Sequence, residues 1–132
     1  MLDFNNLDFS NICENWFLNF NDFLNDDKFN YDNLFYSESH WRDFVSITGD
    51  IITFTGIKNF NDILRNNIIK QEARNFCVDK TRTPPREVVR AGEKVIEAIF
   101  SFKTKEGIGE GILRLMPSKK NPTQFKCWSI ST

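Results

Sequence analysis

Val95-Ile96-Glu97-Ala98-Ile99-Phe100-Ser101-Phe102 is the stretch that decides the fold of this 132-residue chain. It is rich in β-branched and aromatic residues, which favour a strand over a helix. Strand alternation assigns four of its residues to one face: Ile96, Ala98, Phe100 and Phe102. Glu97 lies on the opposite face, among the apolar side chains of Val95 and Ile99. A sheet with a carboxylate inside its strongest strand is therefore expected.

Further strand patterns lie on both sides of this stretch. Residues 111–116 and 125–130 have the same composition, and turn residues at 105–107 and 118–122 separate the three runs. Long strands joined by such short turns predict an antiparallel sheet. Residues 72–81 predict one more strand, and Pro84-Pro85 interrupts the chain after it. Gly107-Ile108-Gly109-Glu110-Gly111 lacks the spacing of a dinucleotide-binding loop and is interpreted as a bend that lets the sheet curl.

The first half of the chain has helical spacing instead. Between Ser10, a predicted N-cap, and the stop Asn25-Asp26-Asp27, the apolar residues fall on one face: Ile12, Trp16, Phe17, Phe20, Phe23 and Leu24. A second short helix is predicted over 29–35 and a third after Gly56, capped by Asn59. Helices first and strands second predict one α+β domain over 1–132, with residues 1–9 as a frayed start.

Composition limits the functions that are open to the chain. Seventeen basic and eighteen acidic residues give a net charge of −1, so no nucleic-acid partner is expected. Fourteen phenylalanines indicate a core of aromatic rings. The three widely spaced cysteines predict small buried hydrophobes in a reducing compartment, with no metal site. The sequence has neither the pattern of a signal peptide nor that of a membrane span, which favours a cytoplasmic protein.

Ser39-His40-Trp41-Arg42-Asp43 holds the single histidine and lies where the helical half gives way to the strands. Alternation puts His40 and Arg42 on one face and Trp41 and Asp43 on the other. Such charged groups form either structural pairs or the lining of a cavity. As an acid or base, His40 would need Asp43, Glu38 or Glu97 as a partner.

Glu97 has the same two interpretations. A carboxylate in an apolar concavity has a raised pKa, which suits general acid–base catalysis. The alternative is a structural pair across the sheet with Arg90, Arg114 or Lys126.

The chain also resembles a known family, and these motifs carry the resemblance. Glu38-Ser39-His40-Trp41-Arg42-Asp43-Phe44, Arg90-Ala91-Gly92, Gly109-Glu110-Gly111-Ile112-Leu113-Arg114-Leu115 and Trp128-Ser129-Ile130 are similar to nuclear transport factor two-like (SnoaL-like) domains. More specifically, the chain resembles the version of this domain that precedes FAD-dependent, flavin-containing-monooxygenase-like proteins. The resemblance implies a cone of about three helices on a curved, mostly antiparallel sheet, with a pocket at one end.

The resemblance suggests candidates but no complete catalytic set. His40, Asp43 and Glu97 are the candidate catalytic residues, and Trp41, Arg42, Phe100 and Trp128 are the candidate ligand-binding residues. FAD and NADPH would belong to a fused or partner flavin domain, because this chain has no nucleotide motif of its own.

Three functions remain open at this point. The first is an accessory or assembly domain that binds a small apolar molecule or a flavoprotein domain. The second is a cofactor-free isomerase, dehydratase or cyclase, and the third is a module that forms a homodimer through the sheet face.

Overall fold

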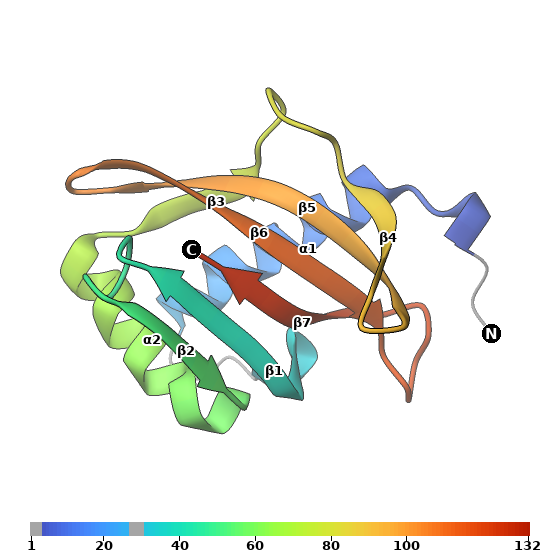
Figure 1. Ribbon diagram of the computed structural model, residues 1–132, viewed down its shortest axis with the longest axis horizontal. Coiled ribbons are helices and arrows are strands. Elements are labelled where there is room, and N and C mark those ends of the chain that lie inside the picture. Colours follow the sequence, from blue (N-terminus) through green and yellow to red (C-terminus); the bar gives the residue numbers. More distant parts are fainter. Residues whose placement is uncertain (1–3, 27–30) are drawn as a thin grey trace.

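The computed structural model describes residues 4–26 and 31–132. Within these residues, two α-helices lie on one face of a curved, seven-stranded sheet, and the other face carries no helix (Figure 1). We call the helix-covered side the inner face and the opposite side the outer face. The predicted α+β class is confirmed.

Helix α1 (Phe9–Asn25) ends at the predicted position, and its apolar stripe is buried. The predicted N-cap is wrong by two residues. Asp8, not Ser10, precedes the helix, and its carboxylate accepts a hydrogen bond from the Asn11 N–H at 3.1 Å. A carboxylate also suits the positive end of the helix dipole.

Helix α2 (Ile57–Gln71) follows Gly56, which has a φ of 85°. A residue with a side chain rarely adopts this conformation, so glycine suits the junction. The predicted cap, Asn59, does not cap the helix N-terminus. Its side-chain amide donates to the Thr55 carbonyl oxygen at 2.8 Å.

The helix predicted over 29–35 is wrong where the structure describes it. Residues 29 and 30 lie outside the described residues, Tyr31–Asn33 form one 3-10 turn, and Phe35 already begins a strand. The Leu34 carbonyl oxygen accepts bonds from the Trp16 indole and from the Cys127 N–H. This tie to the C-terminal strand outweighs the helical spacing, so the described residues contain two α-helices instead of about three.

The strands are β1 (Phe35–Phe44), β2 (Ile51–Thr55), β3 (Arg74–Val78), β4 (Arg86–Arg90), β5 (Glu93–Thr104), β6 (Gly107–Pro117) and β7 (Phe125–Ser131). Their order is β2-β1-β7-β6-β5-β3, and β4 pairs with β5. All pairs are antiparallel except β1 with β7. The predicted mostly antiparallel sheet is confirmed.

Aromatic rings fill the space between α1 and the inner face. Phe100 of β5 contacts Phe17 of α1 at a centroid distance of 5.1 Å, and further rings continue the cluster. Gly109 and Gly111 lie opposite Phe102 and Phe100 in the register, and a Cβ at either glycine would collide with these rings. The glycines of β6 therefore let the core rings lie flat across the strand.

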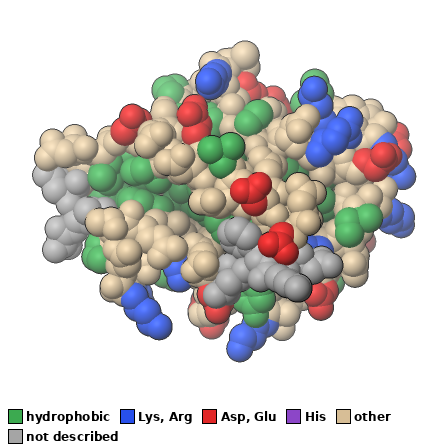
Figure 2. Space-filling model, turned by 180° about the vertical axis from the view of Figure 1, so that it is seen from behind, with side chains coloured by type: hydrophobic (Ala, Val, Ile, Leu, Met, Phe, Trp, Pro, Cys, Tyr) green, Lys and Arg blue, Asp and Glu red, His purple; other side chains and the backbone are tan. Residues whose placement is uncertain are grey.

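The N-terminal residues take part in this packing. The buried ring of Phe4 contacts Phe125 at 6.1 Å, within the stretch for which the sequence predicted a frayed start. Figure 2 shows hydrophobic side chains gathered at this end of the helix side, where Ile12, Trp16 and Leu34 line a shallow groove.

Candidate functional site: the two faces of the sheet

Strand β1 divides the Ser39–Asp43 cluster between two environments. Trp41 and Asp43 are fully buried on the inner face, whereas Arg42 is exposed and His40 half-exposed on the outer face. The predicted alternation is therefore confirmed. It also means that the cluster is not one site.

Asp43 holds the chain together on the inner face. Its carboxylate accepts bonds from the N–H groups of Ile47 and Thr48, from the Thr48 hydroxyl at 2.7 Å and from the Thr132 hydroxyl at 2.7 Å. Thr132 in turn accepts a bond from the Trp41 indole at 2.9 Å. These bonds anchor the loop after β1 and the end of β7, and they use the carboxylate as a structural acceptor.

Two candidate ligand-binding residues lie in the same core. Trp41 stacks on Phe54 at 5.0 Å, and Phe100 contacts Phe17, Phe76 and Phe102. Both are fully buried. Neither residue lines any of the three hollows described below, and neighbouring rings pack against both of them.

On the outer face, Glu97 lies among arginines. Its carboxylate is 3.2 Å from Arg114 Nε, 3.1 Å from Arg90 Nη2 and 3.9 Å from Arg86 Nη2, and its side chain is only 8% exposed. We call these four residues the arginine cluster. Of the two interpretations of Glu97 that the sequence left open, the structure has the structural pair with arginine. Lys126, the third partner that the sequence suggested, lies opposite Met116 instead.

Arg86 was not among the partners that the sequence suggested. It follows Pro84-Pro85 and begins β4, where it lies directly opposite Glu97. The sequence did not indicate that β4 pairs with β5, because a short strand after two prolines gives a weak sequence signal. Arg86 could therefore not be predicted as a partner of Glu97.

The arginine cluster is part of a polar row that crosses the whole sheet. The register aligns Arg86, Glu97, Arg114, Ser129, His40 and Thr55 on successive strands. His40 Nδ1 lies 3.1 Å from the Thr55 hydroxyl. His40 and Glu97 are three strands apart, about 14 Å at ~4.8 Å per strand. Since Asp43 lies on the inner face, the three candidate catalytic groups do not converge on one reacting atom.

The remaining candidates, Arg42 and Trp128, also lie on the outer face. Cys127 and Ile130 both belong to the core, and the register shifts between them, so the bulge turns Trp128 and Ser129 outward. Arg42 places its guanidinium 4.7 Å from the centroid of Phe44. A cation over a ring in this way fixes both side chains at the surface.

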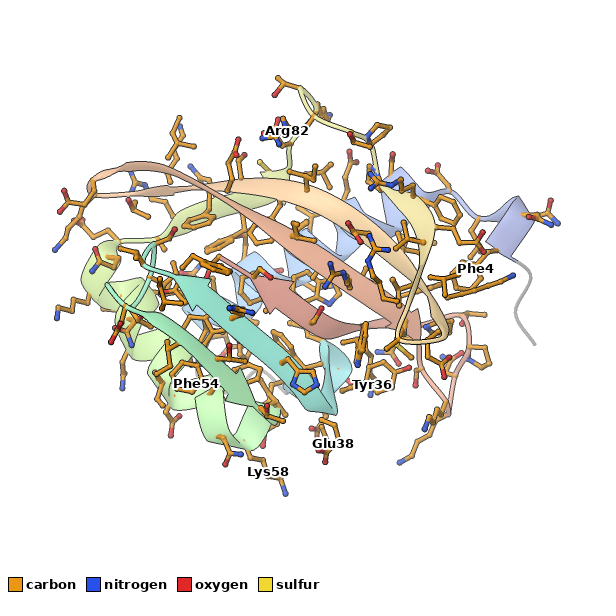
Figure 3. All side chains as sticks on the ribbon, viewed as in Figure 1. Phe4, Tyr36, Glu38, Phe54, Lys58 and Arg82 are labelled. Atoms are coloured by element: carbon orange, nitrogen blue, oxygen red, sulfur yellow. The ribbon has the colours of Figure 1, made fainter. Side chains whose placement is uncertain are left out.

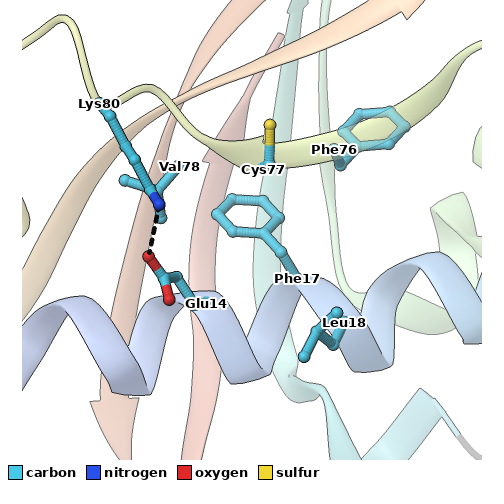
Figure 4. Close-up of a pocket in the computed structure, with 7 residues that line it drawn as sticks. All are labelled: Glu14, Phe17, Leu18, Phe76, Cys77, Val78 and Lys80. Carbon is cyan, nitrogen blue, oxygen red and sulfur yellow. Dashed lines mark ion pairs between the residues drawn. The ribbon is translucent and has the colours of Figure 1, made fainter.

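Three hollows on the surface are candidate ligand sites. One, of about 360 Å³, lies on the outer face between Phe44, Ile99 and Ile112, and the Arg82–Glu110 ion pair at 2.9 Å forms its rim. Arg82 projects from the loop before β4 (Figure 3). A second, of about 240 Å³, lies between α1 and β3, where Lys80 approaches Glu14 at 3.8 Å (Figure 4).

The third hollow, of about 470 Å³, lies between the β4–β5 turn and the loop after β6. Tyr36 lines it and donates to the Pro117 carbonyl oxygen. Burial, and to a smaller degree the nearby charge of Glu93, raise the pKa of Tyr36. A tyrosine with this shift keeps its proton and acts as a donor. None of the three hollows is lined by His40, Asp43 or Glu97.

The cysteines differ from the prediction in one position. Cys13 and Cys127 are buried, but Cys77 of β3 is exposed. Strand alternation turns Cys77 outward, opposite Ser101. In residues 4–26 and 31–132, no three potential ligands gather to hold a metal ion, and no helix is long and apolar enough to span a membrane.

Comparisons with known proteins bear on the fold. No protein-family model matches the sequence, and the search of curated proteins found no relative. A solved structure titled "Rd1NTF2_04 with long sheet", a designed protein, superposes with a TM-score of 0.57. The match covers 90% of this chain and 97% of that chain at 10% identity. The chain therefore has a nuclear transport factor two-like fold.

Proposed function

We propose that this protein is a binding domain that docks onto an acidic protein surface through the outer face of its sheet. The observation that carries the proposal is the contrast between the two faces. Rings fill the inner face, whereas no helix of the described residues covers the outer face, which presents the arginine cluster.

Charge defines the partner. Three guanidinium groups share the single carboxylate of Glu97 in the arginine cluster, so positive charge remains unbalanced there. Arg42 adds a further positive charge on the same face, and Glu93, in register with Arg90, offsets one. Guanidinium groups bind carboxylates in a planar, two-bond geometry, so aspartates and glutamates of a partner are the fitting groups.

Apolar side chains extend the same surface. Phe44 and Ile51 are exposed, and Ile108, opposite Lys103 on β6, is 77% exposed. The hollow beside Phe44 gives this region a concave part. A surface that combines arginine with aromatic and aliphatic groups suits protein recognition. The resemblance described above makes a flavoprotein domain, which would carry the FAD and NADPH, the first partner to test.

A second copy on this face is the other occupant to consider. The exposed Phe44 and Ile108 favour such a homodimer, but the unbalanced charge of two facing arginine clusters opposes it. A small cofactor-free enzyme gains no support from the geometry, because His40, Asp43 and Glu97 are separated and the latter two are held by structural bonds.

The proposal is tested by titrating isotope-labelled protein with an oligoglutamate peptide and following the amide resonances. The amide resonances of the arginine cluster and of β5 and β6 are expected to shift, and these shifts should become smaller at high salt. The double variant Arg90→Glu, Arg114→Glu should show no such shifts. Lys58→Glu on α2 is the matched control, because Lys58 is exposed and lies outside the face (Figure 3).

Two results would overturn the proposal. One is a set of shifts confined to the helix side. The other is an undiminished titration of the double variant. An oligolysine peptide serves as the opposite-charge control and should leave the arginine cluster unshifted.

A further inference from the structure

The free edge of the sheet points to a second interaction, independent of the outer face. Strand β2 is the terminal strand in the sheet order, and β1 is its only strand neighbour among the described residues. An edge strand presents one row of backbone N–H and C=O groups that can pair with another chain. Which groups are free therefore determines what can bind.

The β1–β2 register identifies those groups. Val45 N–H bonds to the Asp50 carbonyl and Gly56 N–H bonds to the Ser39 carbonyl. Hydrogen-bonded pairs alternate along an antiparallel ladder, so residues 52 and 54 also bond to β1. The backbone groups of Ile51, Thr53 and Thr55 consequently point away from the sheet.

Two of these outward groups already have partners inside the chain. The Ile51 N–H donates to the Asp50 carboxylate at 2.8 Å, and the Thr55 carbonyl accepts from the Asn59 side chain at 2.8 Å. The groups left over are the N–H and C=O of Thr53, the N–H of Thr55 and the C=O of Ile51.

These leftover groups are complementary to one another. In an antiparallel pairing about a two-fold axis at Thr53, the two Thr53 residues exchange reciprocal bonds. Each Thr55 N–H then meets the Ile51 carbonyl of the other copy. The locally satisfied groups, Ile51 N–H and Thr55 C=O, face each other and need no new partner. We infer that β2 pairs with β2 of a second copy and joins the two sheets.

Side chains on the edge agree with this occupant. Ile51-Ile52-Thr53-Phe54-Thr55 contains no charge, proline or glycine, the residues that commonly protect an edge. The two-fold register sets Thr53 beside its own copy and Ile52 beside Phe54, pairs that stabilise neighbouring strands. Ile51 is 62% exposed and would lose solvent contact on pairing.

Helix α2 extends the apolar strip on the inner side of the edge. Arg65 of α2 packs on Phe23 of α1, and Ile63 lies two residues earlier, about 200° around the helix, so Ile63 is on the side of α2 that faces away from α1. Ile63 and Ile52 are both exposed hydrophobic residues. A second copy would bring two such strips together along the joined edge.

The inference is tested by measuring molar mass with light scattering on the intact chain. The wild-type protein is expected to be a dimer. Thr53→Lys and Thr53→Glu should each be monomeric, because the two-fold axis places like charges side by side. Their equimolar mixture should recover a dimer, which shows that each variant is folded and that β2 forms the contact.

The matched control is Val89→Lys, a charge on an exposed residue of β4 at the opposite edge. It should leave the dimer intact. A monomeric wild-type protein, or a Thr53→Lys variant that stays dimeric, would overturn the inference. If the Arg90→Glu, Arg114→Glu double variant dissociates the dimer while Thr53→Lys does not, the outer face is the interface between copies.

Discussion

Two buried carboxylates, Asp43 and Glu97, resemble each other in the sequence but differ in the folded protein. Asp43 lies on the inner face and is held by N–H and hydroxyl donors. Glu97 lies on the outer face and is held by three arginines that are themselves partly exposed. Burial alone therefore does not mark a catalytic acid. The partners decide whether a carboxylate fixes the chain or organises charge at a surface.

The largest effect is expected at the inner carboxylate. Asp43→Ala leaves the N–H groups of Ile47 and Thr48 and the Thr132 hydroxyl without their acceptor. Each unsatisfied buried donor costs about 1–3 kcal/mol, so the free energy of unfolding should fall by about 3 kcal/mol or more. Urea denaturation measures it, with Asp62→Ala on the exposed side of α2 as the control. A loss below about 1 kcal/mol would mean that the loop does not depend on Asp43.

A smaller loss is expected at the outer carboxylate. Glu97→Gln keeps the shape but removes the charge that pairs with the arginines, and those arginines remain partly hydrated. We expect the free energy of unfolding to fall by about 1–2 kcal/mol in the same denaturation experiment. A loss that equals that of Asp43→Ala would contradict the distinction between the two carboxylates.

Only part of this comparison could be predicted from the sequence. The periodicity of a strand assigns its residues to the two faces of the sheet. It correctly puts Asp43 on the other face from His40, and Glu97 on the other face from Phe100. It does not assign partners that lie far along the chain, such as Thr132 for Asp43 or Arg86 for Glu97. Nor does it show whether a pocket stays open, because that depends on how the rings of α1 meet those of β5.

The same limit explains the helix that was predicted wrongly. Phe29, Leu34 and Phe35 have helical spacing, but Leu34 is tied to Cys127 of β7 by a backbone bond. A long-range strand pairing of this kind leaves no trace in a short window of sequence. Conversely, α1 and β5 were predicted well. The helical spacing of α1 continues over several turns, and the alternation of β5 continues over several pairs of residues.

The smallest effect concerns the cysteines and needs no mutation of the core. Burial and, to a smaller degree, the charge of Glu14 raise the pKa of Cys13 to about 12, and burial raises the pKa of Cys127. Both thiols should resist a thiol reagent in the native protein, whereas the exposed Cys77 should react. Counting reactive thiols before and after denaturation checks this expectation. Cys77→Ser should have no fast-reacting thiol, and a fast thiol in that variant would mean that the inner face opens.

The affinity of the protein for an acidic peptide tests whether the outer face is the binding surface. In the proposed complex, Glu97 would compete with the partner's carboxylates for the same guanidinium groups. Glu97→Gln should therefore bind oligoglutamate more tightly, by about threefold to tenfold, which is up to ~1.4 kcal/mol. Asp43→Asn, on the inner face, should leave the dissociation constant unchanged. If Glu97→Gln binds more weakly than the wild type or equally well, the arginine cluster is a structural pairing and the outer face is not the docking site.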